Sequence, residues 1–353
     1  MSPNRSHNKY RDAAIDIVRG VAIFTMVCAN LGPLLAEPHS WFFRFYGTFA
    51  APIFVTVAGM MVGYTALKKG EGRDLNYFLK RGLFLIGVGV FIDLFAWGII
   101  PFMTMDVLYL IGIALPLSYL ALRLSPPVSV VLTLLSFLIT PLLQQRLGYT
   151  PYPTEMYFDG SLTETLPNQT NLLNHWIVDG WFPLFPWLAY AFTGTLLARW
   201  RWRGPKYQKF NQGRVIVGSL ALIIWGSATM YLFPGQLYDR DGYSELFYPP
   251  TLGFVILSLG VIVVVLAVAD QSASWRGWEP WRLLGEASLL MYTLHSFIIG
   301  WVLLPHIHDL TGFQLAGIYA ALILILMGCG WGIRKLKQLR MALPQWVMWS
   351  VGA

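Results

Sequence analysis

The chain has 353 residues, of which 56% are hydrophobic and only 12% carry a charge. A soluble globular domain has about 25% charged residues, so this composition excludes a soluble globule and predicts a protein of the lipid bilayer. The formal net charge of +7 would suit nucleic acid, but the basic residues are concentrated in alternate loops, and that distribution excludes nucleic acid as a partner.

Ten apolar segments follow one another along the chain, each close to the roughly 20 residues that cross a hydrocarbon core about 30 Å thick. The predicted transmembrane helices cover residues 14–35, 43–67, 78–100, 104–122, 126–144, 178–199, 213–233, 249–269, 283–304 and 313–333. The expected fold is therefore an all-α polytopic membrane protein, with a single domain over residues 1–353. An even number of crossings places the tails at 1–13 and 334–353 on the same side.

Lysine and arginine residues predict the orientation, because they are retained on the cytoplasmic side. With alternate loops assigned to each side, 21 of the 25 basic residues fall on the side of the termini, six of them between Arg199 and Arg214. We therefore expect both termini in the cytoplasm and the long loops 145–177 and 234–248 outside. The short tails and the absence of an organelle address favour a bacterial plasma membrane.

The first predicted span carries three polar residues on one side. At about 100° per residue, Asp16, Arg19 and Asn30 fall within one narrow stripe of the helix. Polar groups are costly in lipid, so this stripe must face protein or water. Asp16 and Arg19 have the i, i+3 spacing of a pair that neutralises its charges. Such a structural pair accounts for Arg19 as readily as a role in binding a ligand. Asn30 lies near the outer end of the span.

Two groups of residues flank the next spans. His39 lies in a short outer loop before the second span, where it is either a solvated loop residue or the titratable group of a site. On the opposite side, Arg73, Lys80 and Arg81 flank the start of the third span. Their charge marks the cytoplasmic side, and the same charge can hold an anionic ligand.

Carboxylates open two later spans at the outer face. Asp106 begins the fourth span, where it complements the positive end of the helix dipole. Asp179 begins the sixth span, in which Pro183 and Pro186 predict a bend that frees backbone carbonyls. Freed carbonyls within a membrane need a cavity or a partner, so the bend favours a ligand pocket.

The ninth predicted span has a polar face formed by Ser288, Tyr292 and His295, with His295 expected near the middle of the membrane. A hydrogen bond to a neighbouring helix explains such a histidine as readily as a binding site does. The outer-loop residues His306 and His308 are interpreted as solvated, and we expect no metal site.

Five short motifs occur together in the order known from one protein family. They are Asp16-Ile17-Val18-Arg19-Gly20, His39 followed by Pro52 to Gly59, Asp106 to Gly112, Phe182 to Trp187, and Leu289 to His295. With them the whole chain resembles the membrane catalytic domain of the heparan-α-glucosaminide N-acetyltransferase family. The resemblance implies that an acetyl group from cytosolic acetyl-CoA is delivered to a sugar or glycan outside, with His39 as the catalytic histidine.

The chain departs from the family pattern in two places. Met105 stands where the family often has a histidine before Asp106, and the ninth-span Tyr-x-x-His is only loosely kept. These departures leave the acceptor and the part played by Asp106 open.

The chemistry of such a transfer assigns further roles. A histidine suits the base that takes the acceptor's proton at neutral pH, and we expect Asp106 or Asp179 to orient His39. Asn30 or Tyr292 would polarise the thioester carbonyl as a hydrogen-bond donor. The residues expected to bind the donor are Arg19, Arg73, Lys80, Arg81, Tyr292 and His295. Acetyl-CoA enters as a co-substrate, and no permanently bound cofactor is expected.

Two other classes remain open from the sequence. A transporter or a flippase of lipid-linked glycans also has broken helices and intramembrane polar residues, but transporters usually show related halves, which this chain lacks. A structural membrane subunit would need no titratable residues at one depth. The expected partners are acetyl-CoA, a sugar or glycan acceptor and the lipid bilayer, and the sequence leaves a homodimer open.

Overall fold

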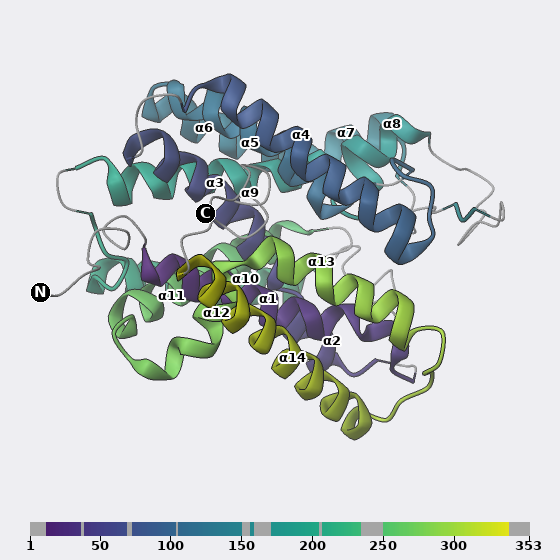
Figure 1. Cartoon of the computed structure of the whole chain (residues 1–353). Helices are drawn as coiled ribbons and strands as arrows, with labels where there is room; N and C mark the ends of the chain where they lie inside the picture. Colours follow the sequence, from purple (N-terminus) through teal and green to yellow (C-terminus); the bar gives the residue numbers. More distant parts are fainter. Residues whose placement is uncertain are drawn as a thin grey trace, which may run out of the picture.

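The computed structural model describes residues 12–36, 39–68, 73–103, 105–149, 156–158, 171–204, 207–233 and 250–338. These residues form a helical bundle (Figure 1). Its α-helices are α1 (Ala13–Asn30), α2 (Trp41–Gly47), α3 (Ala50–Lys68), α4 (Leu75–Ile92), α5 (Val107–Arg123), α6 (Pro126–Leu138), α7 (Thr140–Leu147), α8 (Leu172–Asn174), α9 (Leu184–Trp202), α10 (Gly213–Leu232), α11 (Leu252–Ser272), α12 (Glu279–Glu286), α13 (Ser288–Ile298) and α14 (Gly312–Gln338).

Every predicted span overlaps one or more of these helices, which confirms the all-α fold. Five helical segments are long and apolar enough to cross a membrane, or up to seven if each of two bent pairs is one span. They are Ala13–Leu34, Trp41–Lys68, Gly213–Leu232, Leu252–Ser272 and Gly312–Lys337. The chain is thus an integral membrane protein by the character of its helices, and the count of ten crossings stays a prediction.

Three predicted spans are not single straight helices. The chain bends by 43° between α6 and α7, and by 76° between Arg276–Glu286 and Ser288–Leu303. The sixth span was expected to begin at residue 178, but α9 begins at Leu184, after a π-helical turn at His175–Asp179. The predicted proline bend is confirmed, because Phe185, between the two prolines, has non-helical dihedral angles of φ −110° and ψ 124°.

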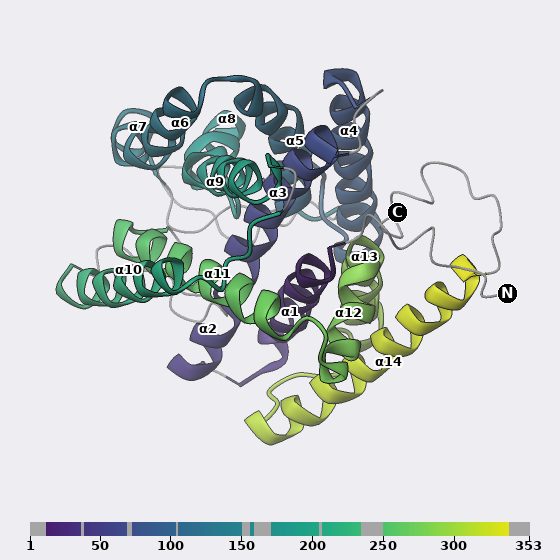
Figure 2. The ribbon, with the colours of Figure 1, turned by 90° about the vertical axis from the view of Figure 1, so that its left-hand side faces the viewer.

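The helices α1 and α3 lie near the centre of the bundle, with the other helices around them (Figure 2). The buried share is 67% for the α1 span and 72% for the span with α3, against 17% for α10 and 22% for α14. The backbones of α3 and α9 approach closely at Gly59, where a Cβ would lie 1.9 Å from the carbonyl oxygen of Ala191. Only glycine fits there. Small residues at contacts between membrane helices commonly allow such a close approach of the backbones.

A buried arginine connects three helices at the end of the bundle where α1 begins. Arg201 of α9 is fully buried and donates to Asp270 of α11 at 2.7 Å and to Asp12 at 2.8 Å. Asp12 also caps α1 by accepting from the backbone N–H of Ala14. The last turn of α9 therefore contains a structural arginine beside the charges that predict orientation. A buried guanidinium requires such carboxylate partners.

The predicted orientation can be tested by chemical labelling. Single cysteines at Ser161 and Gln208, in a background without Cys28 and Cys329, should differ in reaction with an impermeant thiol reagent on intact cells. We expect labelling at residue 161, which lies outside the described residues, and none at residue 208 until the membrane is opened, because basic loops stay cytoplasmic. The reverse pattern would invert the whole topology.

Candidate active site

One face of α13 forms three hydrogen bonds to the centre of the bundle. Ser288 accepts from Arg19 of α1, the Tyr292 hydroxyl donates to Asp106 at 3.2 Å, and His295 bonds Asn30 of α1 at 2.8 Å. We call these three pairs the polar ladder. They confirm that Ser288, Tyr292 and His295 share a face, and that the first-span stripe with Arg19 and Asn30 faces protein.

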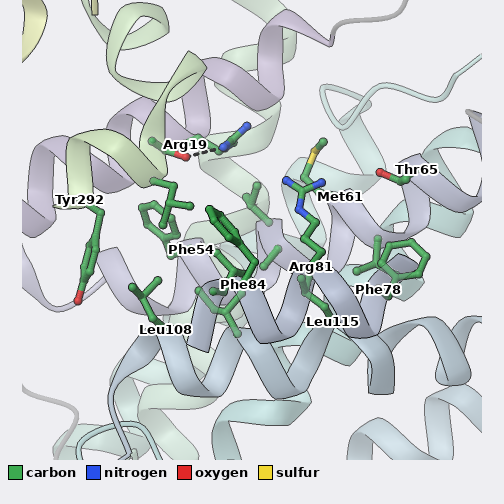
Figure 3. Close-up of a pocket in the computed structure, with 17 residues that line it drawn as sticks. Arg19, Phe54, Met61, Thr65, Phe78, Arg81, Phe84, Leu108, Leu115 and Tyr292 are labelled. Carbon is green, nitrogen blue, oxygen red and sulfur yellow. Dashed lines mark hydrogen bonds between the residues drawn. The ribbon is translucent and has the colours of Figure 1, made fainter. Parts of the chain in front are cut away.

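An inner cavity of about 130 Å³ lies between α1, α3, α4, α5 and α13. Most of its lining is apolar, and its charged lining groups are Arg19 and Arg81. Figure 3 shows Tyr292 at one end of this cavity and Thr65 and Phe78 at the other. Arg19 also lies 4.0 Å from Asp16, so the expected neutralising pair is present and the guanidinium still lines the cavity.

An outer cavity of about 70 Å³ lies on the far side of Tyr292. Its polar lining groups include Asn30 and Asp106, and small residues such as Gly47 and Ala50 form part of its wall. Phe182, in the segment before the α9 bend, also lines it. Two of the predicted catalytic residues therefore face the same small cavity.

The two cavities share four lining residues, Phe54, Leu108, Ile111 and Tyr292, which we call the neck. The cavities therefore adjoin at these side chains. Arg19 lines the inner cavity and Asn30 the outer one, and their separation of 11 positions on α1 corresponds to about 16 Å along the helix axis. The neck thus lies between a cationic chamber and a chamber with amide and carboxyl groups.

Of the predicted basic residues near α4, only Arg81 lines the inner cavity. Arg81 donates to the hydroxyl of Tyr77 at 3.2 Å, and the Arg73 guanidinium stacks over the Tyr77 ring at 4.2 Å. Arg73 and Arg81 therefore contact the same tyrosine, Arg73 at its ring and Arg81 at its hydroxyl. Lys80 is exposed and is absent from the lining of both cavities, because a residue next to Arg81 on a helix is turned by about 100°.

His39 lies in the loop before α2, and both of its ring nitrogens are buried without a hydrogen-bond partner among the described residues. Its ring packs edge-on against Phe43, with centroids 5.6 Å apart. Buried polar atoms normally find partners, so two unpaired imidazole nitrogens mark this side chain as unusual. His39 does not line the inner or the outer cavity.

The structure does not bring either expected carboxylate to His39. Asp179 is bonded by the Nδ1 of His175, at 2.8 Å, and both residues of this pair are buried. Asp106 accepts from Tyr292 instead. The His175 pairing escaped the sequence interpretation, although its i, i+4 spacing was a usable signal.

The sequence interpretation also did not identify the buried acidic residue Asp93. Asp93 begins a π-helical turn at Asp93–Trp97 after α4, is buried, and accepts a hydrogen bond from the hydroxyl of Tyr109. The Tyr109 ring stacks with Trp176 at a centroid distance of 5.9 Å. An acidic residue inside a predicted span was the signal that should have singled it out.

His295 bonds Asn30, the last residue of α1, at 2.8 Å. The span expected over residues 283–304 is bent by 76° before Ser288, and the position of His295 near the middle of the membrane stays a prediction. His295 lines neither cavity, and a direct contact with a bound donor is therefore not part of the observed geometry.

Within the described residues, no group of three or more His, Cys, Asp or Glu side chains could hold a metal ion. The candidate site consists of the two cavities, the neck and the polar ladder, together with the half-buried His39 in the loop before α2.

A comparison with protein families gives a match over residues 11–236 to the model described as heparan-alpha-glucosaminide N-acetyltransferase, catalytic. This segment is more than half of the chain and contains α1 to α10. Among curated proteins, none matches the chain. The matched segment includes Arg19, Asn30, His39, Arg81 and Asp106, whereas α13 lies beyond it.

Proposed function

Since this chain belongs to the heparan-α-glucosaminide N-acetyltransferase family, we propose that it transfers an acetyl group from cytosolic acetyl-CoA to a sugar or glycan on the opposite side of the membrane. The observation that carries the proposal is the pair of adjoining cavities. One of them is lined by two arginines, the other by an amide and a carboxyl group, and they meet at the neck.

The inner cavity has the chemistry that a CoA thioester needs. Guanidinium groups make charge-assisted hydrogen bonds to phosphate, and Arg19 and Arg81 supply two of them. The apolar remainder of the cavity suits the slender pantetheine arm. With the phosphates near Arg81, the thioester would reach the neck and present its carbonyl to the outer cavity.

The outer cavity would receive the acceptor. His39 takes the proton from the acceptor's hydroxyl or amine while the freed electron pair attacks the thioester carbonyl. The carbon–sulfur bond then breaks, the acetyl group stays on the acceptor oxygen or nitrogen, and the imidazolium returns the proton to the CoA thiolate. Because neither His39 nitrogen bonds another described residue, no such hydrogen bond has to break before the imidazole takes the acceptor's proton. A base of this kind contributes about 10²- to 10⁴-fold to the rate.

Purified protein in detergent, incubated with acetyl-labelled CoA and a panel of amino sugars and cell-envelope glycans, tests this function. We expect label to appear in at least one acceptor, with release of free CoA in equal amount. Binding of a glycan without transfer of label, together with its movement across vesicle membranes, would indicate the transporter or flippase alternative instead.

A further inference from the structure

The side-chain amide of Asn30 is hydrogen-bonded to His295 of α13. Its Nδ2 lies 2.8 Å from Nε2 of His295, and Nδ1 of that histidine lies 3.0 Å from the backbone carbonyl oxygen of Met291, one turn earlier. His295 is fully buried. Asn30 lines the outer cavity, and His295 lines neither cavity.

These contacts determine which way the amide points. A backbone carbonyl only accepts hydrogen bonds, so the proton of the neutral imidazole is on Nδ1 and Nε2 carries a lone pair. Asn30 must therefore turn its NH₂ group toward His295 and donate one N–H to Nε2. The amide oxygen, Oδ1, and the second N–H are left over.

We propose that His295 is a positioning residue, which fixes the Asn30 amide so that its Oδ1 and one N–H, instead of two N–H groups, serve the outer cavity. This inference rests on the proposed function and changes the role of Asn30 within it. The oxygen can accept a hydrogen bond from a proton of the acceptor that His39 does not remove, such as the second N–H of an amine or the hydroxyl of a neighbouring sugar carbon, and so aim the nucleophile's lone pair at the thioester. The remaining N–H can stabilise the developing oxyanion.

The opposite tautomer would have the opposite effect. With the proton on Nε2, the amide oxygen would face His295, and the cavity would be offered donors only. An acceptor nucleophile would then lose its orienting partner, while binding of the donor in the inner cavity would not change.

A double-mutant cycle tests the coupling. We expect His295→Phe to lower kcat about 10²-fold, the loss typical of a misplaced reacting group, with KM for acetyl-CoA little changed. The variant that combines Asn30→Ala with His295→Phe should be no slower than Asn30→Ala alone, because residues that act as a unit are not additive. His295→Gln should recover part of the rate, since its side-chain oxygen can accept from Nδ2. Losses that multiply in the double variant, or no recovery with glutamine, would overturn the inference.

His306 provides a matched control. Its Nδ1 makes the same bond one helical turn back, to the carbonyl oxygen of Val302 at 3.1 Å, but its side chain is exposed and meets no asparagine among the described residues. His306→Phe should leave kcat unchanged.

A measurement independent of activity decides the geometry. In protein with ¹⁵N-labelled histidine, the His295 resonances, identified by their loss in His295→Gln, should report a proton on Nδ1, and Asn30→Leu should shift the Nε2 resonance without moving those of His306. A proton on Nε2 in the wild type would refute the inference. If the protein has the predicted tautomer but transfers no acetyl group, the proposed function is wrong and the geometry is right. If the protein transfers the acetyl group but His295 and Asn30 are not coupled, the proposed function is right and the inference about His295 is wrong.

Discussion

Replacing His39 by alanine should remove most acetyl transfer while leaving the fold intact. The expected loss is about 10²- to 10⁴-fold in kcat, the contribution of a positioned general base. Stability should change little, because neither ring nitrogen bonds a described residue and the substitution leaves no protein group unpaired. The lost packing against Phe43 is of the order of 1 kcal/mol. Turnover and thermal unfolding should both be measured in the same detergent.

His306→Ala is the control for this experiment, because it removes an exposed imidazole that bonds the backbone carbonyl of Val302. It should keep full turnover. If His39→Ala were as active as the wild type while His295→Ala had lost all activity, the base would have to be sought in the membrane interior, and the loop histidine would be an ordinary packed residue.

Neutralising Arg81 should weaken the binding of acetyl-CoA and leave the acceptor's KM unchanged. Hydrogen bonds to charged groups contribute about 1.5–3 kcal/mol, which corresponds to a KM for acetyl-CoA raised roughly 10- to 100-fold in Arg81→Ala. The effect should fall on the donor alone, because Arg81 lines the inner cavity and not the outer one. Saturation curves for each substrate, at a fixed concentration of the other, separate the two.

Lys80→Ala is the matched variant, since it removes the same charge from the next residue of α4, on an exposed side that lines neither cavity. It should leave both KM values near those of the wild type. Equal effects at the two positions would mean that only the net charge of the cytoplasmic face matters, and the inner cavity would then have no specific part in holding the donor.

The helices could be predicted from the sequence because long apolar runs decide them locally. The shared face of Ser288, Tyr292 and His295 was also predictable, since helical spacing alone brings such residues to one side. Their partners Arg19, Asp106 and Asn30 could not be assigned, because pairing between helices depends on how the helices pack. The 76° bend before Ser288 could not be predicted either, because no proline lies next to it in the sequence.

The carboxylates show a different limit. Asp179 was one of two candidates for orienting the distant His39, although its partner His175 is only four residues away. The error followed from starting the sixth span at residue 178, which cut the pair in two. Asp93, by contrast, was overlooked within an apolar run, where its burial with Tyr109 depends on contacts between α4 and α5 that the sequence does not specify.

Transfer across a sealed membrane tests the central claim most directly. Vesicles of known orientation would hold the glycan acceptor identified by the panel on the face opposite the basic loops, with acetyl-labelled CoA added on the face of residue 208. The adjoining cavities and the neck predict that the acceptor becomes labelled although neither substrate crosses the bilayer. Labelling only when both substrates share one face would contradict the account, and the two cavities would then not form a route for the acetyl group.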